Sequence, residues 1–379
     1  MTYLVLDAET TTFQKGNPFS IRNKLVVVGI KELDNDYYYL GLDKDEISNK
    51  IKNTTLVTFN GKFDLHWLRR HGIDISSISI WDCQLAHFIL RGQSCPYPSL
   101  NSVAEWYNLG SKLDVVLEDY WRKGIDTDAI PRDVLEEYLR QDLLLTEQVF
   151  QEQLKEFKED PLLYKLFKLH CLDLLVLEDM EWNGMLYDVE ESERLAVKEE
   201  EKIRQIEQEL LKGFEDVPIN FQSRDHLSSY LYGGTITVED RLPIGVFKTG
   251  AKIGQQRFKK VSYTFNLPGF VKPPKGSELA KEGYYATDEG TLRSIRCDTK
   301  SRKRLDLLLE RSKSSKLIGT YYRGIPDLIK EMDWPSGTIH GSFNQCVAAT
   351  GRLSSSRPNL QNFAGAIDTL LGSRYGPSN

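Results

Sequence analysis

Three carboxylates near the amino terminus have positions that could support chemistry. Residues 3–9 alternate in the manner of a strand, so Asp7 and Glu9 project from the same face. Asp64 falls in the first turn of a predicted helix that follows an apolar strand at residues 56–59. Asp64 is therefore expected near the carboxyl edge of a sheet, where the sites of α/β folds form.

A fourth carboxylate, Asp142, lies on a predicted helix that begins after Pro131. It occupies a place in the apolar stripe where a buried leucine would be expected. Tyr138 lies one turn earlier, so its phenol shares that face with the Asp142 carboxylate. The other members of the stripe are Leu135, Leu139, Leu145, Thr146 and Val149.

Convergence of these four carboxylates would create strong repulsion. Two like charges about 4 Å apart repel by about 4 kcal/mol at an effective dielectric of about 20. Divalent cations remove that repulsion, and ligands that are all oxygen suit hard ions such as Mg²⁺ or Mn²⁺. Two such ions roughly 4 Å apart clamp the attacking and leaving oxygens of an in-line displacement at phosphorus. The pattern predicts a two-metal site in which the Tyr138 hydroxyl orients the water.

Each carboxylate also has a simpler explanation when it is taken alone. Asp7 could cap a strand end, Asp64 could be a helix-start carboxylate favoured by the helix dipole, and Asp142 could pair with an arginine. The four together, in this order and with Tyr138 four residues before Asp142, favour the metal site.

The spacing of these residues resembles that of a known family. The run DAET at residues 7–10, an Asn-x₃-Asp pattern that ends at Asp64 and a Tyr-x₃-Asp pattern that ends at Asp142 are similar to the three motifs of DEDDy 3′→5′ exonucleases. These exonucleases are the proofreading domains of family A, DNA polymerase I-like enzymes and their relatives. The resemblance covers residues 1–155 and implies a ribonuclease H-like α/β fold, a mixed sheet flanked by helices.

The resemblance also implies roles for the charged residues. Asp7, Glu9 and Asp142 would bind one Mg²⁺ or Mn²⁺ ion, and Asp7 would also bind a second. Asp64 would hold its ion through water, and Tyr138 would position the nucleophilic water.

Three further residues would contact DNA by the same resemblance. Thr10 and Asn60 would lie beside the 3′-terminal nucleotide. Phe13, six residues after Asp7, falls where the family often has an apolar wedge against the terminal base. The substrate implied is the single-stranded 3′ end of DNA.

The composition is that of a globular intracellular protein. With 379 residues, 40% of them hydrophobic, the chain is long enough for two to three domains. The five cysteines are scattered and form no CxxC pair, so neither a zinc site nor a disulfide framework is indicated. We therefore expect a reducing compartment. No apolar run reaches the roughly 18 residues of a membrane span, and no export signal is visible. We expect a cytoplasmic protein of a bacterium, or of a phage in its bacterial host, without a membrane partner.

Positive charge is concentrated in one part of the chain. The net charge is −6, yet residues 241–316 contain 18 Lys and Arg against 7 Asp and Glu. Basic runs are usually solvated faces, and the aromatic residues among them could simply pack a hairpin. Beside a phosphodiester-cleaving domain, a surface that grips the DNA backbone is the favoured interpretation. Its candidate contacts are Lys259, Lys260, Arg302 and Lys303.

Two helices are expected after the exonuclease-like part. Residues 161–187 are strongly helical up to Asn183-Gly184, and Asp188 can cap a second helix at about 190–213. That second helix is charged nearly all round, with a thin apolar line. It therefore suits an arm that projects from a body.

A second resemblance covers the rest of the chain. The run TGRLSSSRPNLQN at residues 350–362 is similar to the block in which the thumb of family A polymerases leads into the palm. By that resemblance Arg352 would enter the minor groove at the primer terminus, and Asn359 and Gln361 would contact the template–primer duplex nearby.

These resemblances divide the chain into four parts. We expect a DEDDy 3′→5′ exonuclease domain at 1–155, and a connector with the opening helix of the polymerase domain at 156–189. A mostly α-helical, thumb-like region with a basic insertion at 241–285 would occupy 190–330. An incomplete α+β palm would occupy 331–379.

The palm is expected to be incomplete because the segments DxSxxE, Rx₃Kx₆YG and HDE are missing after Asn362. In the family these segments carry the polymerase carboxylates and the nucleotide-binding lysine. DNA synthesis would then require a second polypeptide that supplies palm and fingers, unless the sequence is a truncation. The lack of a five-prime nuclease domain ahead of residue 1 favours a compact, phage-type enzyme.

Two alternative functions remain open. A stand-alone DEDD ribonuclease resembling ribonuclease D would share residues 1–155, but it should lack the block at 350–362. A DNA-binding or assembly subunit with an idle exonuclease would be expected to have lost at least one member of the site.

Overall fold

The computed structural model describes residues 3–33, 35–110 and 115–375. The chain divides into two compact units. Unit 1 comprises Met1–Glu191 and Gly324–Asn379, and unit 2 comprises Ser192–Arg323. Among the described residues, no helix has both the length and the apolar character that a membrane span requires.

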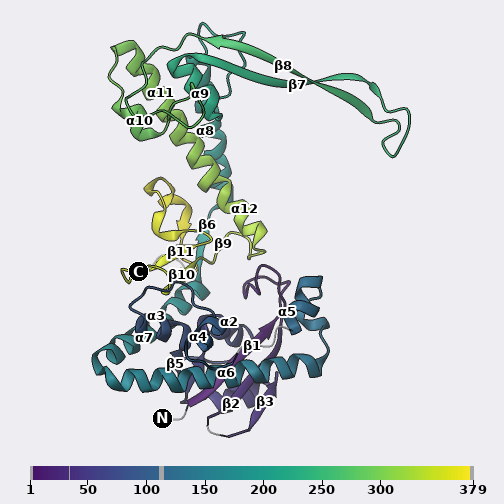
Figure 1. Cartoon of the computed structure of the whole chain (residues 1–379), viewed down its shortest axis with the longest axis vertical. Coiled ribbons are helices and arrows are strands. Elements are labelled where there is room, and N and C mark those ends of the chain that lie inside the picture. The colour runs from purple at the N-terminus through teal and green to yellow at the C-terminus, as the bar shows by residue number, and fades with distance from the viewer. Residues whose placement is uncertain (1–2, 34, 111–114, 376–379) are drawn as a thin grey trace. The chain divides into compact units, whose positions relative to one another are not determined.

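A five-stranded mixed sheet forms the centre of unit 1 (Figure 1). Its order is β3-β2-β1-β4-β5; β1 pairs with β2 antiparallel and with β4 parallel. The strands are β1 (Tyr3–Thr10), β2 (Leu25–Glu32), β3 (Tyr38–Gly41), β4 (Thr55–Thr58) and β5 (Ser79–Asp82). The strands predicted at 3–9 and 56–59 are thus confirmed.

Helices connect and cover these strands. They are α1 (Lys44–Ile51), α2 (Gly61–Arg70), α3 (Cys83–Leu90), α4 (Leu100–Trp106), α5 (Val115–Asp119) and α6 (Arg132–Glu159), with short 3₁₀ turns at Trp121–Lys123 and Thr127–Ala129. Pro131 is the N-cap of α6, as the sequence predicts. The predicted apolar stripe of α6, including Asp142, is buried. The helix lies against β1, β2 and β4.

A buried ion pair joins α6 to β2. Lys31 Nζ lies 2.5 Å from Glu147 Oε2, and the two side chains are only 3% and 6% exposed. The ammonium group also donates to the carbonyls of Glu32 and Asn35, so it is satisfied by several oxygens at once. A buried charge whose partner is removed is costly, so this pair constrains where α6 can lie on the sheet.

The chain leaves this domain through α7 (Pro161–Asn183), which ends at Gly184 with a φ of 57°. Asp188 then accepts a hydrogen bond from the Glu191 amide, at 2.9 Å, at the start of α8 (Val189–Leu210). Both helices follow the sequence-based expectation, although α8 ends three residues earlier than predicted.

The carboxyl-terminal segment returns to unit 1 through α12 (Gly324–Glu331). Strand β6 (Met185–Tyr187) pairs on one side with β9 (Thr338–Ile339) and on the other with β12 (Leu371–Gly372). A second small sheet pairs β10 (Ser342–Asn344) with β11 (Ser354–Ser356), and 3₁₀ turns follow at Leu360–Asn362 and Gly365–Leu370. Strands at the end of the chain therefore have partners in β6 and in one another.

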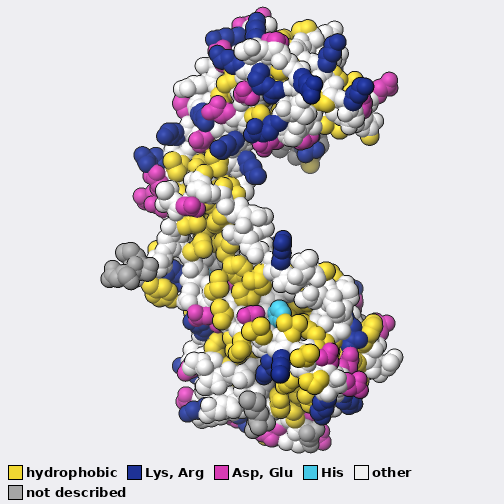
Figure 2. Space-filling view, turned by 90° about the vertical axis from the view of Figure 1, so that its left-hand side faces the viewer, with side chains coloured by type: hydrophobic (Ala, Val, Ile, Leu, Met, Phe, Trp, Pro, Cys, Tyr) yellow, Lys and Arg dark blue, Asp and Glu magenta, His cyan; other side chains and the backbone are white. Residues whose placement is uncertain are grey.

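One face of α7 carries large apolar side chains that are exposed to solvent. They recur at helical spacing and are Leu162, Leu166, Leu169, Leu172, Val176 and Met180. Figure 2 shows hydrophobic side chains gathered over the side of unit 1 where α7 lies.

Unit 2 has its own hydrophobic core. The core is built from the end of α8, from α9 (Arg224–Tyr232), α10 (Glu289–Ser294) and α11 (Thr299–Lys316), and from the bases of strands β7 (Gly234–Val246) and β8 (Gln256–Leu267). A π-helical turn at Leu317–Tyr322 follows α11. Beyond its base, the β7–β8 hairpin extends away from the rest of this unit (Figure 1).

The buried pair in unit 1 gives a stability prediction. Lys31→Met should lower the free energy of unfolding by about 3–5 kcal/mol, because it leaves the Glu147 carboxylate buried beside an apolar group. The double variant Lys31→Met with Glu147→Leu should recover most of that loss, since neither charge is then buried. Chemical denaturation of unit 1 followed by circular dichroism measures both.

The control uses the exposed pair of Lys155 and Glu152 on the same helix, 2.6 Å apart. Lys155→Met should change the stability by less than about 1 kcal/mol. A Lys31→Met protein as stable as the wild type would show that the Lys31–Glu147 pair does not constrain α6.

Candidate metal centre

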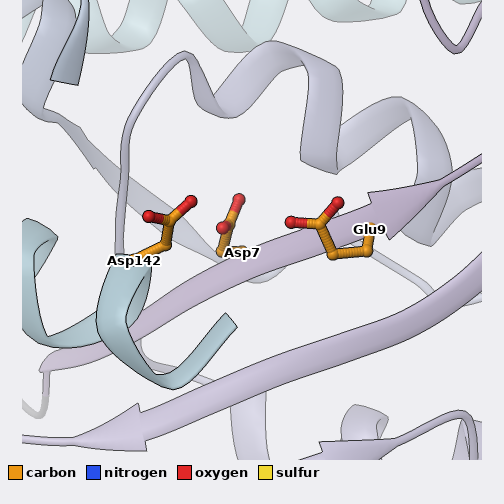
Figure 3. A group of neighbouring side chains, drawn as sticks. All are labelled: Asp7, Glu9 and Asp142. Carbon is orange, nitrogen blue, oxygen red and sulfur yellow. The ribbon is translucent and has the colours of Figure 1, made fainter. Parts of the chain in front are cut away.

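Three of the predicted carboxylates meet in unit 1. Asp7 and Glu9 come from β1 and Asp142 from α6, and one carboxylate oxygen of each lies within 4.8 Å of the others. Figure 3 shows the three groups side by side, the first two on the strand and the third on the helix. Asp142 is 2% exposed and Glu9 is 9% exposed, whereas Asp7 is partly open to solvent. We call this group the acidic triad.

A glycine on the neighbouring strand lets the helix approach the strand. Gly29 on β2 lies directly opposite Asp7 in the antiparallel register, so the two positions share a face. A Cβ atom at Gly29 would lie 2.8 Å from side-chain atoms of Leu139 and Leu143 on α6. The absence of that atom brings α6, and with it Asp142, close to Asp7. Sequence reasoning missed this residue, although a glycine inside an apolar strand is a known sign of close backbone approach.

Asp64 lies outside the triad but is electrostatically coupled to it. Its side chain is 2% exposed, and its pKa is raised well above the usual value, first by burial and then by the charges of Asp7 and Asp82. A hydrogen bond from the Ala8 amide partly opposes the shift. Within the described part of the chain, Asp64 Oδ1 has no hydrogen-bond partner. A buried acceptor of this kind is open to a cation or to water that a cation holds.

Asp82 positions the helix that carries Asp64. It is the N-cap of α3, and its Oδ1 accepts the Leu85 amide at 2.8 Å. Its Oδ2 accepts the Gly61 amide, the first residue of α2, at 2.6 Å. The carboxylate therefore joins the starts of both helices at the edge of the sheet. No role for Asp82 was expected from the sequence, although an Asp between a strand and a helix is a recognisable N-cap signal.

Tyr138 lies beside the triad. Its pKa is raised by burial, by the charges of Asp142, Glu9 and Asp7, and by a hydrogen bond to Asp142. The phenol therefore keeps its proton at neutral pH and acts as a hydrogen-bond donor or acceptor, not as a base. The Trp121 ring packs edge-on against it, with the ring centroids 5.9 Å apart.

The donor set fits divalent cations. The triad and Asp64 offer only carboxylate oxygens, which are the ligands that Mg²⁺ and Mn²⁺ prefer. A nearby cation would supply a partner for the Oδ1 of Asp64 and would offset the unfavourable burial of its charge. The described residues thus form a candidate metal centre in which Asp7, Glu9 and Asp142 would bind directly.

The residues expected at the terminal nucleotide lie at the end of β1, in the loop that follows it, and at the start of α2. Thr10 is buried and donates to the Thr11 carbonyl at 3.1 Å. Phe13 is half-buried, with the Arg22 guanidinium carbon 3.7 Å above its ring. Asn60 is exposed in the left-handed region, at a φ of 64°, and precedes α2.

The expected backbone contacts in unit 2 fall on two elements. Lys259 and Lys260 lie on β8, and Lys303 is exposed on α11. Arg302, also on α11, donates to the Ile295 carbonyl and, at 3.4 Å, to that of Leu292. Arg302 therefore already holds the end of α10.

The polymerase-like contacts lie in the carboxyl-terminal segment of unit 1. Arg352 and Gln361 are exposed. Asn359 is also exposed, and its side chain accepts the Gln361 amide at 3.2 Å, which fixes the start of a 3₁₀ turn. None of the three belongs to the acidic triad.

The acidic triad predicts an unusual stability effect. In EDTA, Asp142→Asn should unfold at the same or a higher temperature than the wild type, because it removes a repelling charge and retains a polar side chain. With Mn²⁺ at about 100 times its Kd, the wild type should gain about 2.7 kcal/mol, and the variant should gain much less. Differential scanning calorimetry with and without Mn²⁺ measures both effects.

Glu159→Gln, at the exposed end of the same helix, is the matched control and should keep the full Mn²⁺ effect. An Asp142→Asn protein that is stabilised by Mn²⁺ as strongly as the wild type would rule out this metal centre.

The close approach at Gly29 gives a second prediction. Gly29→Val should displace α6, reduce Mn²⁺ affinity by roughly tenfold or more, and cost about 1–3 kcal/mol of stability through overpacking. Gly365→Val, in the same unit, is the control because the nearest atom to its added Cβ would be 3.6 Å away. Calorimetric titration with Mn²⁺ provides the measurement. Unchanged Mn²⁺ affinity in Gly29→Val would show that the spacing of helix and strand does not set the site.

The similarity of this chain to known proteins covers more than the metal centre. Residues 269–374 match the family model for DNA polymerase family A. DNA polymerase I of Synechocystis sp. is 28% identical over 90% of this chain and 30% of its own length. The DNA polymerase of Bacillus phage SP01 is 27% identical over 83% of this chain and 34% of its own length. The chain thus spans about a third of the length of these relatives.

A solved structure shows the same fold over most of the chain. It is the POL domain of Pol1 from M. smegmatis in complex with DNA primer-template and dNTP. The TM-score is 0.65 at 18% identity, over 96% of this chain and 52% of that one. The mixed α/β architecture of this chain is therefore similar to that of this solved polymerase domain. Residues 269–374 are thus similar to DNA polymerase family A, and the two relatives named above, which match most of the chain, are DNA polymerases.

Proposed function

We propose that unit 1 is a two-metal 3′→5′ exonuclease that acts on DNA. The observation that carries the proposal is the acidic triad with Tyr138 hydrogen-bonded to Asp142 at its edge. Buried carboxylates at this separation repel one another, and cations that neutralise them are suited to phosphodiester chemistry.

Each residue has a role that follows from its position. Asp7, Glu9 and Asp142 would hold one Mg²⁺ or Mn²⁺, and Asp64 would hold a second ion through water, with Asp7 shared. When bound, the ions supply a hydroxide-like nucleophile and stabilise charge on the leaving oxygen. Tyr138, which stays protonated, would hold the attacking water by a hydrogen bond.

The terminal nucleotide would lie against residues beside the triad. Thr10 and Asn60 would lie beside this nucleotide, and Phe13 would pack against its base. An unpaired end is the preferred substrate in this proposal, because a nucleotide must leave its duplex to reach partly buried carboxylates. The relatives are DNA polymerases, which supports DNA as the substrate and a proofreading role.

DNA synthesis would belong to the whole protein. We propose that Arg352, Asn359 and Gln361 contact template–primer duplex in an enzyme whose palm and fingers come from outside these 379 residues. A second polypeptide is one source of those parts. The exposed apolar face of α7 supports the proposal that unit 1 packs against a further partner, because six large side chains at helical spacing are otherwise left in water.

The polymerase match at 269–374 argues against the stand-alone ribonuclease.

The exonuclease proposal is tested with oligonucleotides labelled at either end. With Mg²⁺, the purified chain should shorten single-stranded DNA from its 3′ end. Asp7→Ala should slow the reaction by about 10³-fold or more, which corresponds to about 4 kcal/mol. Tyr138→Phe should slow it less, by about 10- to 100-fold, since the cations would still activate water.

Asp74→Ala removes an exposed carboxylate of the same unit and is the control expected to retain full activity. Release of nucleotides from the 5′ end alone, or full activity in Asp7→Ala, contradicts the assignment.

A further inference from the structure

The β7–β8 hairpin of unit 2 is a long ribbon with little protein around it. Its strands pair from Gly234 and Leu267 at the base to Val246 and Gln256 near the tip, interrupted by one bulge after Pro243. Twelve to thirteen residues per strand correspond to about 40 Å. Of the hairpin side chains, Ile236 and Leu267 belong to the buried core of unit 2.

The distal half of this ribbon, residues 241–260, is strongly cationic. It contains six Lys and Arg and no Asp or Glu, and the next acidic residue along the chain is Glu278. Every residue from 241 to 260 is exposed except Phe247, which is half-buried. The whole chain carries more acidic than basic residues, so this segment departs sharply from the rest.

The strand register puts cations on both faces of the ribbon. Arg241 lies directly opposite Lys260 on one face, and Lys259 lies opposite Leu242 on the other. Arg257 is two residues from Lys259 and shares its face. Like charges directly opposite each other destabilise a hairpin, and the ion pair of Lys260 with Glu239, at 2.9 Å, offsets this only in part. An anionic ligand would remove the remaining repulsion.

Cations on both faces suit a ligand with negative charge on two sides. A B-form DNA groove has that property because a phosphate backbone runs along each wall. The major groove, about 12 Å wide, accepts a two-stranded ribbon. The paired part of the distal half has about six residues per strand, so it is about 20 Å long and spans somewhat more than half a turn of duplex. A flat acidic protein surface would neutralise one face only. The major groove of an RNA duplex is too narrow and deep for side chains to read.

We propose that the distal half of the β7–β8 ribbon binds duplex DNA in the major groove, through phosphate contacts on both walls. The choice of DNA rests on the proposed function, whereas the cationic ribbon is independent of the acidic triad. Such contacts are largely independent of base sequence. These contacts would hold the duplex during repeated reactions. The affinity for DNA would increase with the number of phosphates contacted.

The strand register allows the ribbon to be shortened without disturbing its base. Leu242 and Lys259 face each other, so replacing residues 243–258 by Asn-Gly closes a two-residue hairpin between them. This change removes three cations, Lys248, Lys252 and Arg257. The triple variant Lys248→Gln, Lys252→Gln and Arg257→Gln removes the same charges and keeps the full ribbon. The matched control is Lys198→Gln, Arg204→Gln and Lys212→Gln, which removes three charges of the same unit away from the ribbon.

Binding to a blunt 24-base-pair DNA duplex is measured by fluorescence anisotropy between 50 and 300 mM salt, with EDTA present. For both ribbon variants, the slope of log K against log salt should become shallower by about 2–3, since each lost phosphate contact contributes about 0.9. Their affinity at the lowest salt should fall at least tenfold. The control triple should keep the wild-type slope, and an RNA duplex of equal length should bind wild type and variants alike.

Four results would overturn the proposal. These are unchanged slopes in both ribbon variants, an equal loss in the control triple, a loss confined to the shortened ribbon, or an equal loss on the RNA duplex. EDTA binds the divalent cations that the proposed exonuclease requires, so DNA is not degraded during the binding measurement. Degradation of a five-nucleotide single strand in Mg²⁺ by the same wild-type preparation tests the proposed function separately, so failure of one is distinguishable from failure of the other.

Discussion

The mutual repulsion of Asp7, Glu9 and Asp142 is the constraint on which the structure of unit 1 depends. Their oxygens lie within 4.8 Å of one another, so each pair of ionised groups would oppose the fold by about 3–4 kcal/mol at an effective dielectric of about 20. Folding stability is only about 5–15 kcal/mol for a typical domain, so the triad requires strong support from its surroundings. That support comes from elements that hold the strand and the helix together irrespective of the carboxylates. A metal site held in this way would be arranged for its ions before they bind.

The supports act at different points of the same sheet. The Lys31–Glu147 pair lies two residues along β2 from Gly29 and fixes α6 by a buried charge contact. Gly29 removes the side chain that would keep α6 away from β1. Asp82 joins the starts of α2 and α3, which sets the place of Asp64. Each support is a tertiary contact between segments distant in the chain. A change at any of them should therefore alter cation affinity without touching a ligand.

The sequence predicts the local elements well and the tertiary contacts poorly. Strand alternation locates β1, and the three-to-four spacing of apolar residues locates α6 and the burial of Asp142, because these patterns depend on neighbouring residues only. The importance of Gly29 depends on Leu139, 110 positions later, and no periodicity reports that contact. A count of charges likewise cannot distinguish Arg302, which holds helix carbonyls, from Lys259, which faces water. The roles of Thr10, Phe13 and Asn60 remain predictions.

The two proposed DNA-binding regions, the β7–β8 ribbon and the acidic triad, carry opposite charges and therefore interact with phosphate groups in opposite ways. The ribbon carries cations permanently, so it can attract duplex DNA at long range and weakens as salt screens it. The acidic triad repels phosphate until cations arrive, because three carboxylates and a phosphodiester carry charge of one sign. If the proposed function holds, substrate and ions would therefore bind the triad cooperatively, each raising the affinity for the other. Without ions, DNA would be held by the cationic ribbon and kept from the carboxylates, so the proposed cleavage would begin only after the site had bound its ions.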